Sequence, residues 1–206
     1  MRFSRHSSYI ADFHHRVLLL TSHQGDLVPQ ALAGNAAILA AAESNPAIKR
    51  LVITSSVAAA HTAANATDSA EQPVVALEND SAFARYTQSK TAAAYQIHAY
   101  AASHPQRHFS IVNIYPGWVI GVNPLAKTRY DALNGSNMTL GWLFLPIKVN
   151  VMFGVPEDEP PLPVASGTVH VLDVAEGHVK ALDVKKVPGY YQHFVMDSHS
   201  PHGASE

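Results

Sequence analysis

The sequence predicts an α/β fold built around a mainly parallel β-sheet. Short runs of branched apolar residues alternate along the chain with longer, alanine-rich stretches of helical character. Residues 51–53 are apolar throughout, which is typical of a strand that helices cover on both faces. With 206 residues, 47% of them hydrophobic and 15% charged, the chain can bury a sizeable core.

The composition argues against several classes of partner and site. A net charge of -2, with histidine neutral, indicates neither a nucleic-acid partner nor a membrane surface. The chain has no cysteine, and its 13 histidines show no H-E-x-x-H pattern, so we predict no metal site. Neither a long apolar span nor a secretory signal is visible, which leads us to expect a cytoplasmic protein.

Three elements are predicted in the first part of the chain. Residues 16–21 form a continuous apolar run that we predict to be a short buried strand. Asp26 is the predicted N-cap of a helix over residues 27–43, with Pro29 in the first turn, where proline is tolerated. Residues 51–56 are predicted as a strand that ends in three hydroxyl side chains.

Two more elements follow a long connection. Residues 58–79 are irregular, and a loop of that length in a compact domain often has a function. A helix is predicted to open at about Tyr86 and to continue to Ser103. Residues 109–115 are a further predicted strand, which leads into residues 116–121 at its carboxyl end.

The last third of the sequence is less regular. Residues 123–163 are expected to form a helix or a flap over the site, and residues 168–171 a short strand. A helix is predicted over residues 174–182 with Asp173 as its N-cap, and a last strand over residues 189–195. No element is predicted for residues 1–15, and the tail, residues 197–206, is expected to be frayed.

Polar residues stand where two predicted strands end. Thr54, Ser55 and Ser56 follow one strand, and Pro116 and Gly117 follow the next. Ligands of parallel sheets bind beyond the carboxyl ends of the strands, so these positions are candidates for a site. Taken alone, the hydroxyl run also fits a simple polar strand end, and the glycine a simple turn.

Tyr86 and Lys90 are spaced by four residues near the start of the predicted helix. Residues at that spacing share a face, so a phenol and an ammonium would lie side by side. A neighbouring positive charge favours the phenolate, and the expected result is a lowered pKa for Tyr86 and a role in proton transfer. On spacing alone, an exposed helical pair without function is the more common case.

Read in order, these features resemble a known family. Thr54-Ser55-Ser56, Tyr86-x-x-x-Lys90 and Pro116-Gly117-Trp118-Val119 resemble the extended short-chain dehydrogenase/reductases, of the NAD-dependent epimerase/dehydratase superfamily. Residues 49–56, 113–121 and 169–178 resemble its dihydroflavonol-reductase-like and aldehyde-reductase-like branch, and the resemblance covers roughly residues 26–182. It implies a Rossmann-like parallel sheet with flanking helices.

The resemblance also implies a role for each site residue. Ser56 would hydrogen-bond the substrate oxygen, Tyr86 would transfer the proton, and Lys90 would hold the nicotinamide ribose and lower the pKa of Tyr86. The implied cofactor is NADP, with NAD as the alternative. The implied cofactor-binding residues are Thr54, Ser55, Tyr86, Lys90, Pro116, Gly117, Trp118 and Val119.

The sequence departs from the family at one point. The family's glycine-rich turn, G-x-x-G-x-x-G, which carries the cofactor pyrophosphate at a helix N-terminus, is not found, and the first glycines, Gly25 and Gly34, are isolated. The resemblance therefore implies an N-terminally truncated chain in which residues 16–21 are the family's fourth strand. Three explanations compete: a fragment or mis-spliced form of an active reductase, which we favour, a degenerate relative, or a chain that a partner completes.

The same resemblance implies two regions and an activity. Residues 1–122 would be a partial NAD(P)-binding domain, and residues 123–206 a substrate-binding region with returning elements at 168–182. The expected function is reduction of a ketone or aldehyde of a small organic molecule, for instance in secondary metabolism. The alternatives are a sugar-nucleotide epimerase or dehydratase and a non-catalytic binding protein. The expected partner is a small carbonyl or alcohol substrate, and the oligomeric state stays open.

Overall fold

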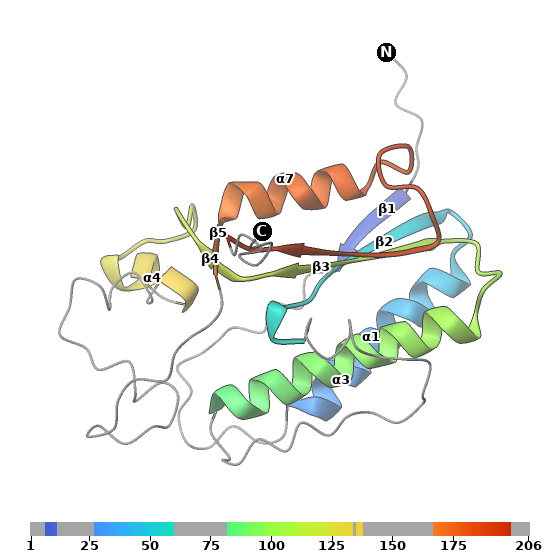
Figure 1. Ribbon diagram of the computed structural model, residues 1–206, viewed down its shortest axis with the longest axis horizontal. Helices are drawn as coiled ribbons and strands as arrows, with labels where there is room; N and C mark the ends of the chain where they lie inside the picture. Colours follow the sequence, from blue (N-terminus) through green and yellow to red (C-terminus); the bar gives the residue numbers. More distant parts are fainter. Residues whose placement is uncertain (1–6, 12–26, 60–81, 134, 138–166, 199–206) are drawn as a thin grey trace, which may run out of the picture.

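A four-stranded parallel sheet forms the centre of the molecule, in the order β1-β2-β3-β6. The computed structural model describes residues 7–11, 27–59, 82–133, 135–137 and 167–198 (Figure 1). The strands of this sheet are β1 (Ser7–Ala11), β2 (Ile48–Thr54), β3 (Ser110–Pro116) and β6 (Tyr191–Met196). The prediction of an α/β fold with a parallel sheet is confirmed.

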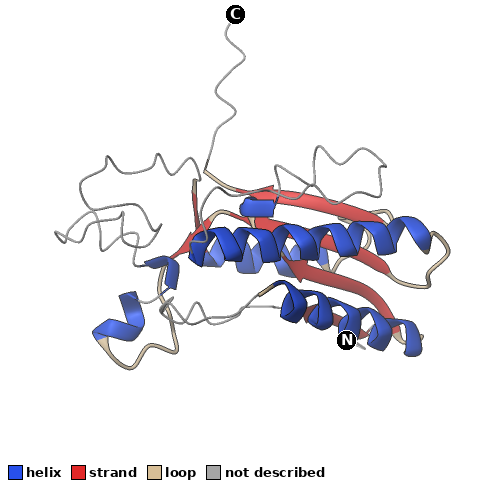
Figure 2. Ribbon diagram, turned by 90° about the horizontal axis from the view of Figure 1, so that it is seen from below, coloured by secondary structure: helices blue, strands red, loops and turns tan. Residues whose placement is uncertain are grey.

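Helices cover both faces of the sheet. Helices α1 (Val28–Ser44) and α3 (Ala82–Ser103) lie together on one face, and α7 (Val171–Ala181) lies on the other (Figures 1 and 2). Alternate residues of a strand point to opposite faces, so Leu51 and Ile53 pack in the cluster that holds residues of α1 and α3. Val52, between them, packs in the cluster with Ala181 of α7. This two-sided burial explains why β2 is apolar at consecutive positions.

The strand beside β2 was not predicted from the sequence. Strand β1 lies in a stretch to which no element was assigned, and it pairs in parallel with β2, with Tyr9 opposite Leu51. The predicted strand at residues 16–21 lies outside the described residues. Residues 7–11 carry little apolar periodicity, so only pairing with β2, which is distant in sequence, identifies them as a strand.

Helix α1 lacks the cap that we predicted for it. Its N-cap is Leu27, which makes no side-chain capping bond, so Asp26 is not the cap. Pro29 does lie in the first turn, where its missing N–H has no carbonyl to bind and costs nothing. At the other end, the Asn45 side chain accepts a hydrogen bond from the backbone N–H of Ala47 at 3.1 Å and closes the turn into β2.

The capping prediction for α7 is also wrong. The helix begins at Val171, and the ring Nδ1 of His170 accepts the N–H of Leu172 at 3.3 Å, so His170 is the N-cap. Asp173 lies in the first turn instead, where a carboxylate is favourable to the helix dipole. Helix α3 likewise begins earlier than predicted, at Ala82, so Tyr86 lies in its second turn.

A two-stranded parallel sheet extends the carboxyl edge of the main sheet. It pairs β4 (Trp118–Ile120) with β5 (Thr168–His170), and α4 (Arg129–Leu133) and η1 (Gly135–Asn137) follow β4. Gly117 joins β3 to β4, and a Cβ there would collide with the carbonyl oxygen of Gly167. The predicted flap is described only at residues 123–133 and 135–137; its remainder lies outside the described residues.

The start of the predicted frayed tail belongs to this sheet. An Asp197 carboxylate oxygen accepts the N–H of Gly167 at 3.2 Å. The Ser198 hydroxyl accepts the N–H of Thr168 at 2.9 Å, and the Ser198 N–H donates back to the Thr168 carbonyl at 3.1 Å. These bonds continue β6 beyond its end, so residues 197 and 198 are structured, contrary to the prediction.

Arg50 is a buried charge at the centre of the fold. It is 1% exposed, and its guanidinium donates to the Ser110 hydroxyl at 2.8 Å and to the carbonyls of Ala181 and Val187 at 2.8 and 2.7 Å. Burial lowers its pKa, and the nearby Asp183 carboxylate opposes that effect. Arg50 thus ties β2 to β3 and to the chain that follows α7.

Among the described residues, no helix is both long and apolar enough to cross a membrane.

Candidate active site

The strand ends bring the predicted hydroxyl residues to one edge of the sheet. Thr54 is the last residue of β2, and the Ser55 N–H donates to the Ile114 carbonyl of β3 at 2.7 Å. This bond continues the β2–β3 ladder by one residue beyond the end of β2. It holds Ser55 and Ser56 beside β3, at the edge where ligands of parallel sheets bind.

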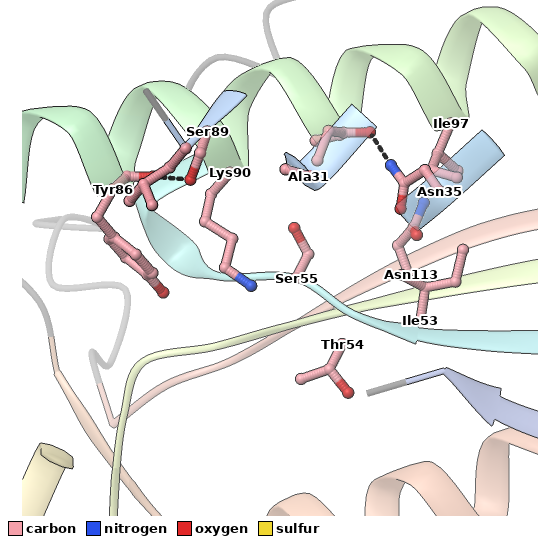
Figure 3. A pocket seen from close by; sticks show the side chains of 13 residues that line it. Ala31, Asn35, Ile53, Thr54, Ser55, Tyr86, Ser89, Lys90, Ile97 and Asn113 are labelled. Carbon is pink, nitrogen blue, oxygen red and sulfur yellow. Dashed lines mark hydrogen bonds between the residues drawn. The ribbon is translucent and has the colours of Figure 1, made fainter. Parts of the chain in front are cut away.

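Ser56, Tyr86 and Lys90 come together at this edge. The side chain of Ser56, which is 9% exposed, is hydrogen-bonded to the Tyr86 phenol. The Ser56 Oγ also accepts the N–H of Ala58 at 3.2 Å, which fixes the hydroxyl at the start of the next turn. The ammonium of Lys90 lies 5.8 Å from the centre of the Tyr86 ring, and Figure 3 shows both side chains extending from α3 toward Ser55.

Burial controls the protonation of Tyr86. The residue as a whole keeps some exposure, but protein surrounds its hydroxyl end, and this burial raises the pKa of Tyr86. The Ser56 hydrogen bond acts in the opposite direction and is the smaller effect. The expected net lowering of the Tyr86 pKa is therefore wrong, because the pKa is raised. The cost of desolvating a phenolate outweighs its stabilisation, and Tyr86 is a neutral phenol near neutral pH.

Thr54 faces away from this group. Its hydroxyl lies 2.8 Å from Nε2 of His178 on α7, and Figure 3 shows its side chain directed away from the side chains of Ser55 and Lys90. Nδ1 of His178 lies 2.8 Å from the Val174 carbonyl, which can only accept, so Nδ1 carries the hydrogen. In the neutral ring, Nε2 then accepts from Thr54. Sequence reasoning missed this link, because nothing in the sequence shows that β2 and α7 meet.

A pocket lies beside Tyr86 and Lys90, between the two helices of one face and the sheet. Its walls come from α1, β2, α3 and β3, and most of them are apolar. Two buried amides, Asn35 and Asn113, line it as well, and sequence reasoning identified neither of them. The signal available was weak, because an isolated asparagine within a helix or strand pattern does not reveal what it faces.

The segment after β3 lies at the same edge of the sheet but outside this pocket. Pro116 is buried at the end of β3, and Gly117, Trp118 and Val119 are partly exposed. None of these four lines the pocket beside Lys90. The Gly117 N–H donates to the Met196 carbonyl at 2.9 Å, so the main structural role of this turn is to join β3, β6 and the small sheet.

Comparison with known proteins places the chain in a family, although no family model matches it. It is 33% identical over 176 residues to the NAD-dependent epimerase/dehydratase FUM13 of Gibberella moniliformis, which covers 76% of this chain. It is 28% identical over 169 residues to the NAD-dependent epimerase/dehydratase ALT6 of Alternaria alternata, which covers 78% of this chain. The chain belongs to the extended short-chain dehydrogenase/reductase family. It spans 45% of the length of each of these relatives.

Solved structures of other proteins show the same fold. Gre2 from Candida albicans superposes with a TM-score of 0.62 at 21% identity, over 93% of this chain and 56% of Gre2. Vestitone reductase from alfalfa superposes with a TM-score of 0.54 at 16% identity, over 93% of this chain and 54% of that protein. At these identities the likeness shows the fold, so the sheet with its flanking helices is Rossmann-like, as predicted.

Proposed function

We propose that this chain carries the proton-transfer site of an NAD(P)H-dependent reductase that acts on a ketone or aldehyde of a small organic molecule. The observation that carries the proposal is the hydrogen bond between Ser56 and a neutral Tyr86 phenol, with the Lys90 ammonium beside the same ring. These groups lie at the carboxyl edge of a parallel sheet, where ligands of such folds bind. Because the chain spans about half of its relatives, the activity of the whole protein belongs to this proposal.

Each side chain has a role that its position supports. Ser56 and Tyr86 share a hydrogen bond, so one substrate oxygen can replace that bond and accept from both hydroxyls. As negative charge develops on that oxygen, Tyr86 transfers its proton to it, and Ser56 keeps the oxygen in place. The Lys90 ammonium then stabilises the phenolate that Tyr86 becomes. This charge appears only during the reaction, which is when a stabilising cation accelerates it.

The nicotinamide end of the cofactor fits the groups on this edge. Ser55 and Lys90 offer a hydroxyl and an ammonium facing the same space, which suits the ribose hydroxyls of a dinucleotide (Figure 3). When bound, the nicotinamide supplies the hydride. Gre2 from Candida albicans is described in complex with NADPH, which supports NADP over NAD as the cofactor. Thr54 would contribute only through its backbone, because its side chain bonds His178.

The protonation of Tyr86 suits the proposed reduction. Burial raises its pKa, so near neutral pH the site holds the protonated phenol that reduction of a carbonyl needs as its proton donor.

An epimerase or dehydratase is the second candidate. The observation in its favour is the description of both FUM13 and ALT6 as NAD-dependent epimerase/dehydratases. A serine, tyrosine and lysine set serves that chemistry too, so an assay with sugar nucleotides in place of carbonyl compounds separates the two. Conversion of a sugar nucleotide without net oxidation of NADPH would favour the second candidate.

The Tyr86→Phe variant tests the proposed role of the phenol. In this chain, or in a longer protein that contains it, removal of the proton donor is expected to reduce ketone-dependent NADPH oxidation roughly a hundredfold to ten-thousandfold. The exposed Tyr190→Phe is the matched control and should leave turnover unchanged. Undiminished turnover in Tyr86→Phe would contradict the proposed mechanism.

A further inference from the structure

The inner end of the pocket carries two buried side-chain amides. Asn35 on α1 is 4% exposed and Asn113 on β3 is 2% exposed, yet both line the pocket that Tyr86 and Lys90 also line. Figure 3 shows the two amides directed toward each other, at the opposite end of the view from Tyr86. The hydrogen-bond partners of two polar side chains so deeply buried should be identifiable, because buried polar groups in proteins are nearly always paired.

Each amide donates a hydrogen bond through its nitrogen, and its oxygen remains available as an acceptor. Nδ2 of Asn35 donates to the Ala93 carbonyl of α3 at 3.0 Å, and since a carbonyl can only accept, this bond fixes the orientation of the Asn35 amide. Nδ2 of Asn113 donates to the Tyr191 hydroxyl at 3.1 Å. Within the part of the chain that the structure describes, neither Oδ1 accepts a hydrogen bond. The inner pocket therefore presents two acceptors and apolar walls, including Ile53 and Ile97.

The chemistry of these walls selects one class of ligand group. A carboxylate or phosphate would face two carbonyl oxygens, which repel it. An ammonium would lose its hydration without gaining a counter-charge, because Lys90 and Tyr86 are the only ionisable residues among the described groups that line the pocket. An uncharged donor, a hydroxyl or an amide N–H, satisfies the free oxygens at no such cost.

We propose that Asn35 and Asn113 form a binding subsite for the hydroxyl or amide group of a neutral ligand. This inference rests on the proposed reductase function. Together they define the substrate class as a carbonyl compound that carries an uncharged hydrogen-bond donor. Its carbonyl lies at Ser56 and Tyr86, and its donor group reaches the two amides across the apolar part of the pocket. The subsite thus discriminates against acids, amines and fully apolar ketones.

Hydroxyacetone and butanone are a matched pair of probes for this subsite. Both are small neutral ketones that differ by a hydroxyl in place of a methyl group. Neither is long enough to span the pocket from Tyr86 to the amides, so the pair measures binding at the subsite alone. Titrated into the full chain without cofactor, hydroxyacetone is expected to bind roughly tenfold more tightly than butanone, in the millimolar range. The side-chain amide resonances of Asn35 and Asn113 should shift with hydroxyacetone and stay in place with butanone. Equal affinities, no binding, or shifts confined to other residues would overturn the proposal.

Variants then separate the subsite from a purely structural role of the amides. Asn35→Ala and Asn113→Ala should each reduce the preference for hydroxyacetone to about twofold or less, whereas the exposed Asn123→Ala should retain it. If a pocket variant does not fold, the resonance shifts in the wild-type chain still decide the matter. Folded variants that keep the full preference would assign the amides to packing alone.

The outcome is distinguishable from failure of the proposed function. Tyr86→Phe should keep the preference for hydroxyacetone, because the phenol hydroxyl does not contact the subsite group. A wild-type chain that shows no preference for hydroxyacetone but retains turnover would refute the subsite alone. Turnover that survives Tyr86→Phe would refute the proposed mechanism and leave the binding result untouched.

Discussion

At the residue scale, burial decides what the titratable side chains do. Tyr86 and Arg50 are both held in protein surroundings that disfavour their charged forms, yet their situations differ. Arg50 stays charged, because hydrogen bonds to three partners and the field of Asp183 compensate for lost hydration. Tyr86 stays neutral because its hydrogen bond with Ser56 does not compensate for burial. One residue therefore supports the fold, and the other is suited to donate a proton.

Replacement of Arg50 by methionine tests the structural role. The variant leaves the Ser110 hydroxyl and two carbonyls without their donor, so we expect a loss of about 3 kcal/mol in the free energy of unfolding. Urea denaturation measures it. The neighbouring Lys49→Met is the matched control, since Lys49 is exposed on the same strand and should change stability by less than about 0.5 kcal/mol. Equal losses of unfolding free energy in the two variants would show that the hydrogen bonds of buried Arg50 do not stabilise the fold.

The buried tyrosines predict a loss of stability at alkaline pH. Burial raises the pKa of Tyr115, and the neighbouring Tyr191 adds to the effect. Above about pH 10 the unfolded chain releases the proton while the folded chain keeps it, so the folded state binds more protons and the free energy of unfolding falls as pH rises. Tyr115→Phe should flatten this fall in urea titrations between neutral and strongly alkaline pH. The exposed Tyr190→Phe should leave the slope as it is.

At the scale of elements, the site depends on contacts between segments far apart in sequence. Strand β2 presents Ser55 and Ser56, and its last residue is held from the opposite face by α7, through Thr54 and His178. Helix α3 presents Tyr86 and Lys90, and it packs beside α1 on the other face. The distance between Ser56 and Tyr86 is therefore set by how the helices pack on the sheet.

A double-mutant cycle measures the link between β2 and α7. Thr54→Val leaves the acceptor nitrogen of His178 unpaired, and His178→Leu leaves the Thr54 hydroxyl unpaired, so each should cost about 1–3 kcal/mol. The double variant should cost less than their sum by about 1 kcal/mol or more, because neither group is then left alone. Thermal or urea unfolding gives the three values.

An exposed pair on the same helix serves as the control. The Lys180 ammonium and the Glu176 carboxylate are 2.7 Å apart on the solvent side of α7, where ion pairs contribute little. Lys180→Met should change stability only slightly. Strict additivity of Thr54→Val and His178→Leu would contradict the proposed link, and the nitrogen resonances of His178 should show the hydrogen on Nδ1 in the wild-type chain.

At the scale of the whole molecule, the described sheet has two edges. Strand β1 pairs with β2 alone and β6 pairs with β3 alone, while the four-stranded sheet holds its site-forming strands, β2 and β3, at the centre. Central placement protects these strands from solvent on both sides. It also explains why the carboxyl ends of β2 and β3 meet at a well-defined edge.

The set of residues available to bind the cofactor predicts weak binding of NADPH by this chain. The edge offers Ser55 and Lys90 to the nicotinamide ribose, but the sequence contains no glycine-rich turn for the pyrophosphate. Titration calorimetry with NADPH should therefore show a dissociation constant well above the micromolar range. Submicromolar binding would contradict this prediction and would require another phosphate site in the chain. Gre2 from Candida albicans, described in complex with NADPH, is a suitable positive control.

Much of the element pattern could be predicted from local sequence. Helix α1, strands β2, β3 and β6, and the strand and helix near residue 170 follow from apolar periodicity and alanine content, with errors of a few residues at their ends. Those ends depend on capping, which failed at Asp26 and Asp173 because Leu27 and His170 occupy the cap positions instead. Strand β1 was missed because its identity comes from pairing with β2.

The sequence by itself determined the α/β class, the family, and the order of Ser56, Tyr86 and Lys90, because these depend on periodicity and on motifs that are local in the chain. The tertiary structure alone decided the neutral state of Tyr86, the turning of Thr54 toward His178, and the burial of Arg50, Asn35 and Asn113. The physical reason is common to all of them. Burial and hydrogen-bond partners are properties of distant segments brought into contact, and no local pattern encodes them.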